Sequence, residues 1–235
     1  MRFFSSYSSF FRLIPGLLLF LVLLLLPACR GAGGFLAGAF ASQTIKAVYA
    51  LDPETPTLVL VDDPENYLGD SSLRYLVAQQ TTLLLSEQKK APSLIETRKL
   101  SELALELGSQ KIAAMPVDQI GRKLDAARVI HVHIENAAFI YELGMLRPSI
   151  NARVKVIDTA TGKRLFPPDN SSGLPVLGYL VSANLRYRTQ EEQAIAMMPV
   201  LRHDLAQKLG VHIAQLFFDH EPPPKDGQPI GDDIQ

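Results

Sequence analysis

Cysteine is nearly absent from this sequence: Cys29 is the single thiol in 235 residues, and tryptophan does not occur. One thiol excludes an internal disulfide and any metal site built from several thiolates. A charge excess is also absent, with 23 Lys+Arg against 24 Asp+Glu, so there is no electrostatic reason to expect nucleic acid as a partner. The sequence contains no Gly-x-Ser-x-Gly, phosphate-binding-loop or zinc-protease motif. We therefore predict a protein that is not an enzyme and carries no cofactor.

One long apolar run is present, and it lies near the N-terminus. Leu17 to Leu26 is an unbroken apolar block, preceded by the cations Arg2 and Arg12 and followed by the small residue Ala28. A cationic start, a short apolar segment and a small-residue cleavage site are typical of a secretory signal peptide. An uncleaved membrane anchor is the alternative. A spanning helix needs about 20 apolar residues, and Pro15 interrupts the longer segment that this would require.

The segment Leu26-Pro27-Ala28-Cys29 resembles the lipobox of bacterial lipoproteins. The resemblance implies that the chain is cut before Cys29 and that its thiol carries palmitate-like acyl chains, which anchor the protein in a membrane. Dual acylation is sufficient for stable attachment. Arg30 stands where lipoproteins retained at the inner membrane carry an aspartate. The resemblance therefore implies the outer membrane of a bacterial cell envelope, with the protein facing the periplasm.

Removal of residues 1–28 would leave a mature chain with a small acidic excess. The removed segment holds two cations and no acids, so 21 Lys+Arg and 24 Asp+Glu remain, a net charge of −3. The remaining length suits one domain. We expect residues 29–56 to be a glycine-rich flexible tether and residues 57–220 to be the domain. Residues 221–235 are rich in proline, glycine and aspartate, which predicts a disordered tail.

Apolar patterns in the first half of the domain predict one buried strand and several helices. Residues 57–62 form a continuous β-rich run, typical of a strand buried on both faces. A helix is expected to start at Asp70 or Ser71. A shorter helix capped by Thr97 should follow, and another is expected over 116–124. A short strand is expected at 93–96. The first helix would bury residues that recur at helical spacing: Leu73, Leu76, Val77, Leu83 and Leu84.

Alternation of apolar and polar residues predicts the two longest strands, over 128–141 and 149–158. A turn with Gly162 leads to a return strand at 164–166, and a further strand is expected within 176–187. The apolar pattern of residues 190–220 predicts a helix that is broken at Pro199 and weakened by Gly210. The predicted fold class is α/β, a mixed sheet with packed helices in a two-layer or three-layer sandwich.

Two segments of this domain carry a resemblance to a known family. They are residues 120–134 (IGRKLDAARVIHVHI) and 152–165 (ARVKVIDTATGKRL). Both are similar to envelope lipoproteins related to the curli secretion channel subunit CsgG and the penicillin-binding-protein activator LpoB. The resemblance covers about residues 57–219 and implies an α/β sandwich that acts in envelope assembly, secretion or cell-wall machinery. Two departures are His131 and His133, which replace small residues, and the lack of a spare pair of alternating segments for pore-forming hairpins.

His131, His133 and Glu135 form the best metal-like pattern in the sequence. Alternate strand residues project from one face about 6.5 Å apart, a spacing at which two imidazoles can share a zinc ion. Such a site would need a further ligand, for which Asp158 and His203 are the candidates. The solvent-facing side of a half-buried strand explains the same pattern without any metal.

Arg153 and Lys155 are neighbours on the polar face of the second long strand and could contact an acidic partner. We predict a lipid-anchored, non-catalytic binding or accessory module with an unidentified envelope protein as partner. Two alternatives stay open. One is a periplasmic metal-dependent protein that uses His131 and His133, and the other is a homo-oligomer that assembles into a secretion ring.

Overall fold

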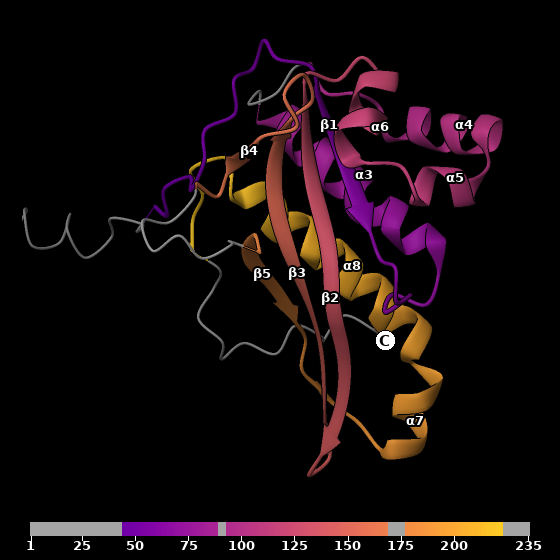
Figure 1. Ribbon diagram of the computed structural model, residues 1–235. Coiled ribbons are helices and arrows are strands. Elements are labelled where there is room, and N and C mark those ends of the chain that lie inside the picture. Colours follow the sequence, from indigo (N-terminus) through magenta and orange to yellow (C-terminus); the bar gives the residue numbers. More distant parts are fainter. Residues whose placement is uncertain (1–43, 89–92, 169–176, 223–235) are drawn as a thin grey trace, which may run out of the picture. The chain divides into compact units, whose positions relative to one another are not determined.

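The computed structural model describes residues 44–88, 93–168 and 177–222, and residues 45–220 form one compact unit (Figure 1). One strand comes first, then four helices, then five strands, and two helices end the described order. The elements follow in the order β1 (Thr57–Asp62), α3 (Ser71–Glu87), α4 (Thr97–Leu107), α5 (Ser109–Ala113), α6 (Val117–Lys123), β2 (Arg128–Glu142), β3 (Met145–Asp158), β4 (Arg164–Phe166), β5 (Tyr179–Asn184), β6 (Tyr187–Arg188), α7 (Glu191–Ala196) and α8 (Met198–Gln215).

All six strands belong to one mixed sheet. β1 pairs in parallel with β2, and β2 pairs with β3 as an antiparallel hairpin. The other edge of β3 pairs with three short strands, β4, β5 and β6, each antiparallel. The predicted α/β class and mixed sheet are confirmed. The strand at 57–62 is confirmed residue for residue, and only a single bridge, between Thr57 and Leu94, forms in the segment expected as a short strand.

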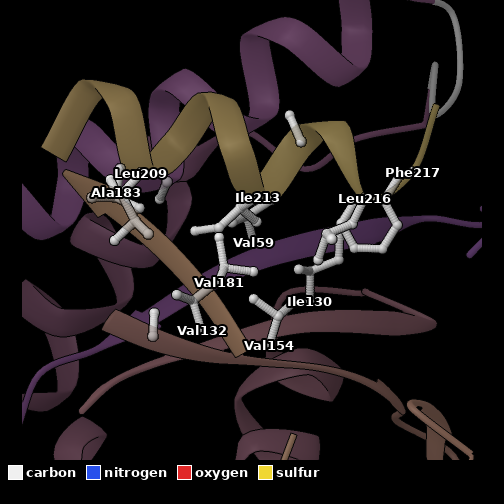
Figure 2. Packing of buried hydrophobic residues seen from close by; sticks show 14 of the residues in the cluster. Val59, Ile130, Val132, Val154, Val181, Ala183, Leu209, Ile213, Leu216 and Phe217 are labelled. Atoms are coloured by element: carbon white, nitrogen blue, oxygen red, sulfur yellow. The ribbon is translucent and has the colours of Figure 1, made fainter. Parts of the chain in front are cut away.

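Helices cover the two faces of the sheet unequally. α3 and α8 pack on the inner face, where alternate residues of β1, β2 and β3 such as Val59, Ile130 and Val154 are buried (Figure 2). α4, α5 and α6 cover the outer face only beside β1, over Leu58 and Val129. The sandwich therefore has three layers at its β1 side and two layers toward β5. Over the rest of the outer face of β2, β3 and β5, the described residues place no helix.

The close contact between α3 and α8 depends on Gly210. A Cβ atom placed there would lie 2.8 Å from the Cβ atom of Gln80 and 2.9 Å from the carbonyl oxygen of Val77. The Thr81 hydroxyl also donates to the Gly210 carbonyl oxygen at 3.2 Å. The glycine was expected only to weaken the helix. Its structural role is to let the two helix backbones approach each other.

We predict that Gly210→Ala lowers the free energy of unfolding by up to about 2 kcal/mol. Alanine would gain up to about 1 kcal/mol of helix propensity, but forcing a methyl group against the α3 backbone costs about 1–3 kcal/mol. Urea unfolding followed by circular dichroism measures the difference. The control is Gln207→Ala on the exposed side of α8, which should leave stability unchanged. A Gly210→Ala protein more stable than the wild type would contradict the close packing.

The folded unit begins at Ile45, before the expected boundary at residue 57. The backbone amide of Ile45 donates to the carbonyl oxygen of His220 at 2.7 Å, and that of Tyr49 donates to Leu216 at 3.0 Å. The centre of the Tyr49 ring lies 5.2 Å from the centre of the Phe166 ring. The second half of the expected tether is therefore part of the domain.

Helix boundaries follow the sequence with small shifts. Asp70 caps α3, and its carboxylate accepts from the Ser72 backbone amide at 2.8 Å, as predicted. The α4 prediction is one residue off: Glu96 precedes the helix, and Thr97 is its buried first residue. Leu83 was expected in the core, but half of it is exposed. The break before Pro199 is confirmed, because α7 ends at 196 and α8 starts at 198.

No helix within the described ranges is long and apolar enough to cross a membrane.

Candidate binding face

The uncovered outer face of the sheet brings together the residues that the sequence singled out on β2 and β3. His131 lies opposite Lys155 and His133 opposite Arg153 in the β2–β3 pairing. Their chain neighbours Val132 and Val154 point inward and are fully buried, so the four polar side chains share the outer face. The predicted one-sided arrangement of these residues is therefore correct.

The two histidines lie close to a carboxylate that was not part of the metal-like pattern expected from the sequence. Asp62, the last residue of β1, has Oδ2 3.2 Å from Nδ1 of His133 and 4.0 Å from Nε2 of His131. Parallel pairing of β1 with β2 places Asp62 directly opposite His133. Burial lowers the pKa of His131 from 6.5 to about 4. The negative charge of Asp62 raises this pKa and the positive charge of Lys155 lowers it further, but burial is the largest effect. His131 is therefore neutral at pH 7.

Glu135 does not join the histidines, because the strand is irregular at that point. The register between β2 and β3 shifts between Ile134 and Asn136, which leaves Glu135 as the extra residue of a β-bulge. Its Oε1 accepts from Nε of Arg153 at 2.8 Å. The predicted alternation through Glu135 is corrected here: a bulge redirects the carboxylate to an arginine.

The two further metal ligands that the sequence suggested have other partners. The Asp158 carboxylate accepts from the backbone amide and the hydroxyl of Thr161, at 2.8 and 2.7 Å. His203 belongs to α8, on the inner side of the sheet, with Nδ1 3.7 Å from Asp204. Within residues 44–88, 93–168 and 177–222, no group of three or more His, Cys, Asp or Glu is arranged to hold a metal ion. The metal-dependent alternative stays a prediction without a contact that supports it.

A ladder of polar side chains continues along the outer face from β2 to β5. The Asn151 amide donates to Asn136 Oδ1 at 2.9 Å, and the Ser182 hydroxyl donates to Asn151 Oδ1 at 2.6 Å. Leu180 of β5 lies opposite Arg153 on the same face and is about half exposed, at 48%. The face is thus a mixture of fixed hydrogen-bonding groups and one apolar edge.

Positive charge gathers at the end of this face nearest the β2–β3 turn, and no pattern in the sequence predicted it. Arg147 of β3 and the two arginines that flank the inward-facing Tyr187 are exposed. Among the described residues, the outer face carries five cations and three carboxylates: Arg147, Arg153, Lys155, Arg186 and Arg188 against Asp62, Glu135 and Glu142. The whole chain has a formal net charge of −1. The outer face is therefore basic on an otherwise slightly acidic protein.

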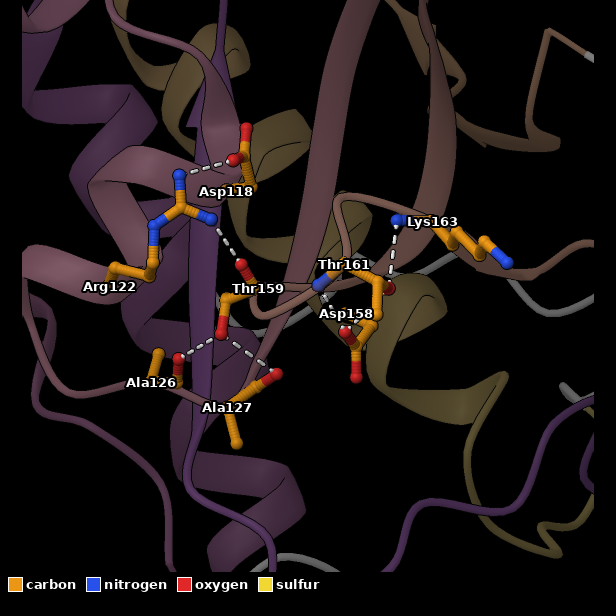
Figure 3. A network of polar contacts seen from close by, with 8 residues as sticks. All are labelled: Asp118, Arg122, Ala126, Ala127, Asp158, Thr159, Thr161 and Lys163. Carbon is orange, nitrogen blue, oxygen red and sulfur yellow. Dashed lines mark hydrogen bonds and ion pairs between the residues drawn. The ribbon is translucent and has the colours of Figure 1, made fainter.

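A polar network fixes the upper end of β3 to the loop after α6 (Figure 3). The buried Thr159 hydroxyl donates to the carbonyl oxygens of Ala126 and Ala127, at 2.6 and 3.1 Å. Arg122 donates to the Thr159 carbonyl oxygen and also pairs with Asp118. Hydrogen bonds from Thr161 hold the pKa of Asp158 below its usual value. These contacts orient the strands that carry the face. Most of the residues involved lie in the two segments, 120–134 and 152–165, on which the family resemblance rests.

Comparisons with known proteins give distant likenesses only. No family model matches the sequence, and neither does any curated protein. Lipoprotein GNA1162 from Neisseria meningitidis is 15% identical, over 64% of this chain and 96% of that one, with a TM-score of 0.39. A PelC dodecamer from Paraburkholderia phytofirmans is 9% identical, over 75% and 95%, with a TM-score of 0.38. The protein CT253 from Chlamydia trachomatis is 12% identical, over 68% and 98%, with a TM-score of 0.34.

These likenesses are too weak to carry an argument about function. The resemblance to CsgG-related and LpoB-related lipoproteins stays a prediction, as does a homo-oligomeric ring. Cys29 and its flanking signal lie outside the described residues.

Proposed function

We propose that this protein is a lipid-anchored lipoprotein of the bacterial envelope, with a folded domain that is a non-catalytic binding module for assembly, secretion or cell-wall machinery. The observation that carries the proposal is the outer face of β2, β3 and β5, which is polar and basic and has no helix over it among the described residues. The lipobox-like segment that ends at Cys29 supports the anchor. Anchoring would raise the local concentration of the domain near its partner.

The charges of the outer face favour an acidic partner. Lys155 is half-buried and makes no ion pair with any residue that the structure describes. Arg153 is already ordered by Glu135 and also donates to the Gly178 carbonyl oxygen at 3.4 Å. A preordered guanidinium loses little side-chain entropy on binding, and a fork of donors suits a carboxylate or phosphate. An acidic protein segment placed here would contact both cations and the apolar edge at Leu180.

The anchor is tested by Cys29→Ser in the full-length protein. In cells grown with labelled palmitate we expect label on the wild type and none on the variant, because the variant has no thiol to acylate. Mass spectrometry of the wild-type N-terminal peptide should show cleavage before Cys29 and added acyl chains. Replacing Ser42, which lies beyond the signal, with alanine is the control and should leave the palmitate labelling unchanged. An unmodified Cys29 in membrane-bound protein would overturn the lipoprotein proposal.

A further inference from the structure

β2 and β3 continue beyond the end of β5 as a hairpin arm, and the two-residue strand β6 pairs with the β3 side of the arm at Met145 and Leu146. The pairing with β5 ends at Ser149 and Asn184, whereas β2 and β3 stay paired to Glu142 and Met145. Figure 1 shows the arm running to the end of the fold beside α7. We define the arm as residues 137–148. Only its residues up to 141 were predicted as strand, because the second strand was expected to start at Ser149.

The inner side of the arm is held firmly against the helices. Leu146 is buried with Ala194 of α7 and Leu201 of α8. The Tyr141 hydroxyl donates to the Thr189 carbonyl oxygen at 3.1 Å, and the guanidinium carbon of Arg202 lies 5.3 Å from the ring centre of Phe139. The arm is therefore a preordered projection, and its tip and outer side need no rearrangement to meet a partner.

The turn at the tip holds a leucine in an unfavourable conformation. Leu143 and Gly144 have φ angles of 51° and 74°, both in the left-handed region. Hairpin turns of this kind strongly favour Asn-Gly or Asp-Gly, because a bulky side chain is strained at positive φ. Leu143 is also 94% exposed, more than any other large apolar residue in the described part of the chain. The fold gains nothing from this side chain, so a role outside the fold explains it better.

Apolar and cationic side chains surround the tip together. Ile140 on the outer side of the arm is 55% exposed, and it lies opposite Arg147. Arg188 lies opposite Met145, and neither Arg147, Arg186 nor Arg188 makes an ion pair among the described residues. Against these cations, the outer side of the arm carries the acidic residue Glu142 beside the turn. The outer side of the tip is thus apolar and basic.

We infer that the arm tip docks onto the surface of an anionic lipid bilayer, with Leu143 and Ile140 entering the headgroup region and the arginines meeting lipid phosphates. Apolar insertion combined with cations is the chemistry of interfacial membrane binding. Leu143 at the tip is 94% exposed, so it can enter a lipid surface without rearrangement. The inference rests on the proposed lipid anchor, which keeps the domain close to a membrane. Docking would fix the orientation in which the outer face meets its partner.

Vesicle sedimentation tests the docking without the lipid anchor. The protein is the mature chain, residues 29–235, carrying Cys29→Ser so that no acyl chain contributes. The probes are vesicles of phosphatidylethanolamine with phosphatidylglycerol, and vesicles of phosphatidylcholine alone. We expect binding to the anionic vesicles that weakens as salt is added. Replacing Arg147, Arg186 and Arg188 by glutamine should weaken it roughly 100-fold, since each cation near an anionic surface contributes about fivefold.

Leu143→Asn separates docking from folding. Asparagine suits the left-handed turn, so the variant should unfold at the same or a higher temperature, yet bind anionic vesicles about tenfold more weakly. Leu105→Asn is the matched control, since Leu105 is 87% exposed on α4, and it should bind as the wild type does. Equal binding by Leu143→Asn, equal binding to both vesicle types, or no binding at all would each overturn the docking. Palmitate labelling of Cys29→Ser tests the anchor independently of these results.

Discussion

Phe217→Ala is expected to lower the free energy of unfolding by about 3–5 kcal/mol, the range for removing a fully buried phenylalanine. Phe217 is 2% exposed and follows the end of α8, where it packs on the inner face of the sheet (Figure 2). Its ring also meets Tyr49 edge-on, with 6.4 Å between the ring centres. Truncation would therefore leave a cavity and also loosen the segment that starts at Ile45.

Urea unfolding of the mature chain measures this loss, with the slope m compared to verify that both proteins unfold in the same way. The matched control is Leu105→Ala, which removes an exposed apolar side chain from α4 and should change stability by less than about 0.5 kcal/mol. Because a domain of this kind is stable by only about 5–15 kcal/mol, the Phe217 variant should be visibly less stable. A loss as small as that of the control would show that α8 does not close the core as described.

His131 is expected to make the domain less stable as the pH falls from about 6.5 to about 4. Burial lowers the pKa of its imidazole to about 4 in the folded protein, against the ordinary value of 6.5 that applies to the unfolded chain. The residues that face it are Asp62, which opposes the shift, and Lys155 and His133, which add to it. Between the two values the unfolded chain binds a proton that the folded chain does not, so stability rises with pH. The loss on acidification is about 3 kcal/mol.

The measurement compares unfolding curves of the wild type and His131→Gln across this pH window. Glutamine keeps hydrogen-bonding capacity but does not titrate, so the variant should lose about 3 kcal/mol less than the wild type between pH 6.5 and pH 4. Carboxylates titrate in both proteins, and their effect cancels in the difference. Parallel curves for the two proteins would contradict a buried neutral His131.

Local sequence patterns predicted the core of the fold because burial imposes a period on the sequence. The continuous run at 57–62 and the alternation of Ile130, Val132 and Ile134 follow directly from strands that face helices. The turn at Gly162 and the cap at Asp70 depend on chemistry within a few residues, and both are confirmed. The same alternation correctly placed His131, His133, Arg153 and Lys155 on one face.

The sequence did not predict features that depend on distant contacts. The bulge at Glu135 is invisible in the pattern, because the extra residue is defined only by the pairing with β3. Asp62 reaches the histidines through parallel pairing of segments that are far apart in the chain. The tip of the arm was missed because Leu143 occupies a turn position that normally signals itself with asparagine or aspartate. The glycine at 144 was the available signal.

The segment before β1 shows a different limit of sequence reasoning. Prolines at 53 and 56 stand just before the expected boundary at residue 57, and the residues before them have no helical or strand period. Their order comes from backbone hydrogen bonds to the end of α8, such as those that Leu216 accepts from Val48 and Tyr49. Contacts of this kind join the two ends of the domain and leave no local pattern.

Site-specific photo-crosslinking in the cell tests the central claim, that the outer sheet face binds an envelope partner. A photoreactive phenylalanine derivative would replace Lys155 or Ser182, both on the outer face, in the full-length protein. The control position is Gln207, which is exposed on α8 on the opposite side of the sheet. We predict an adduct of the same mass from Lys155 and Ser182, and none from Gln207. An adduct from Gln207 without one from either outer-face position would contradict the account.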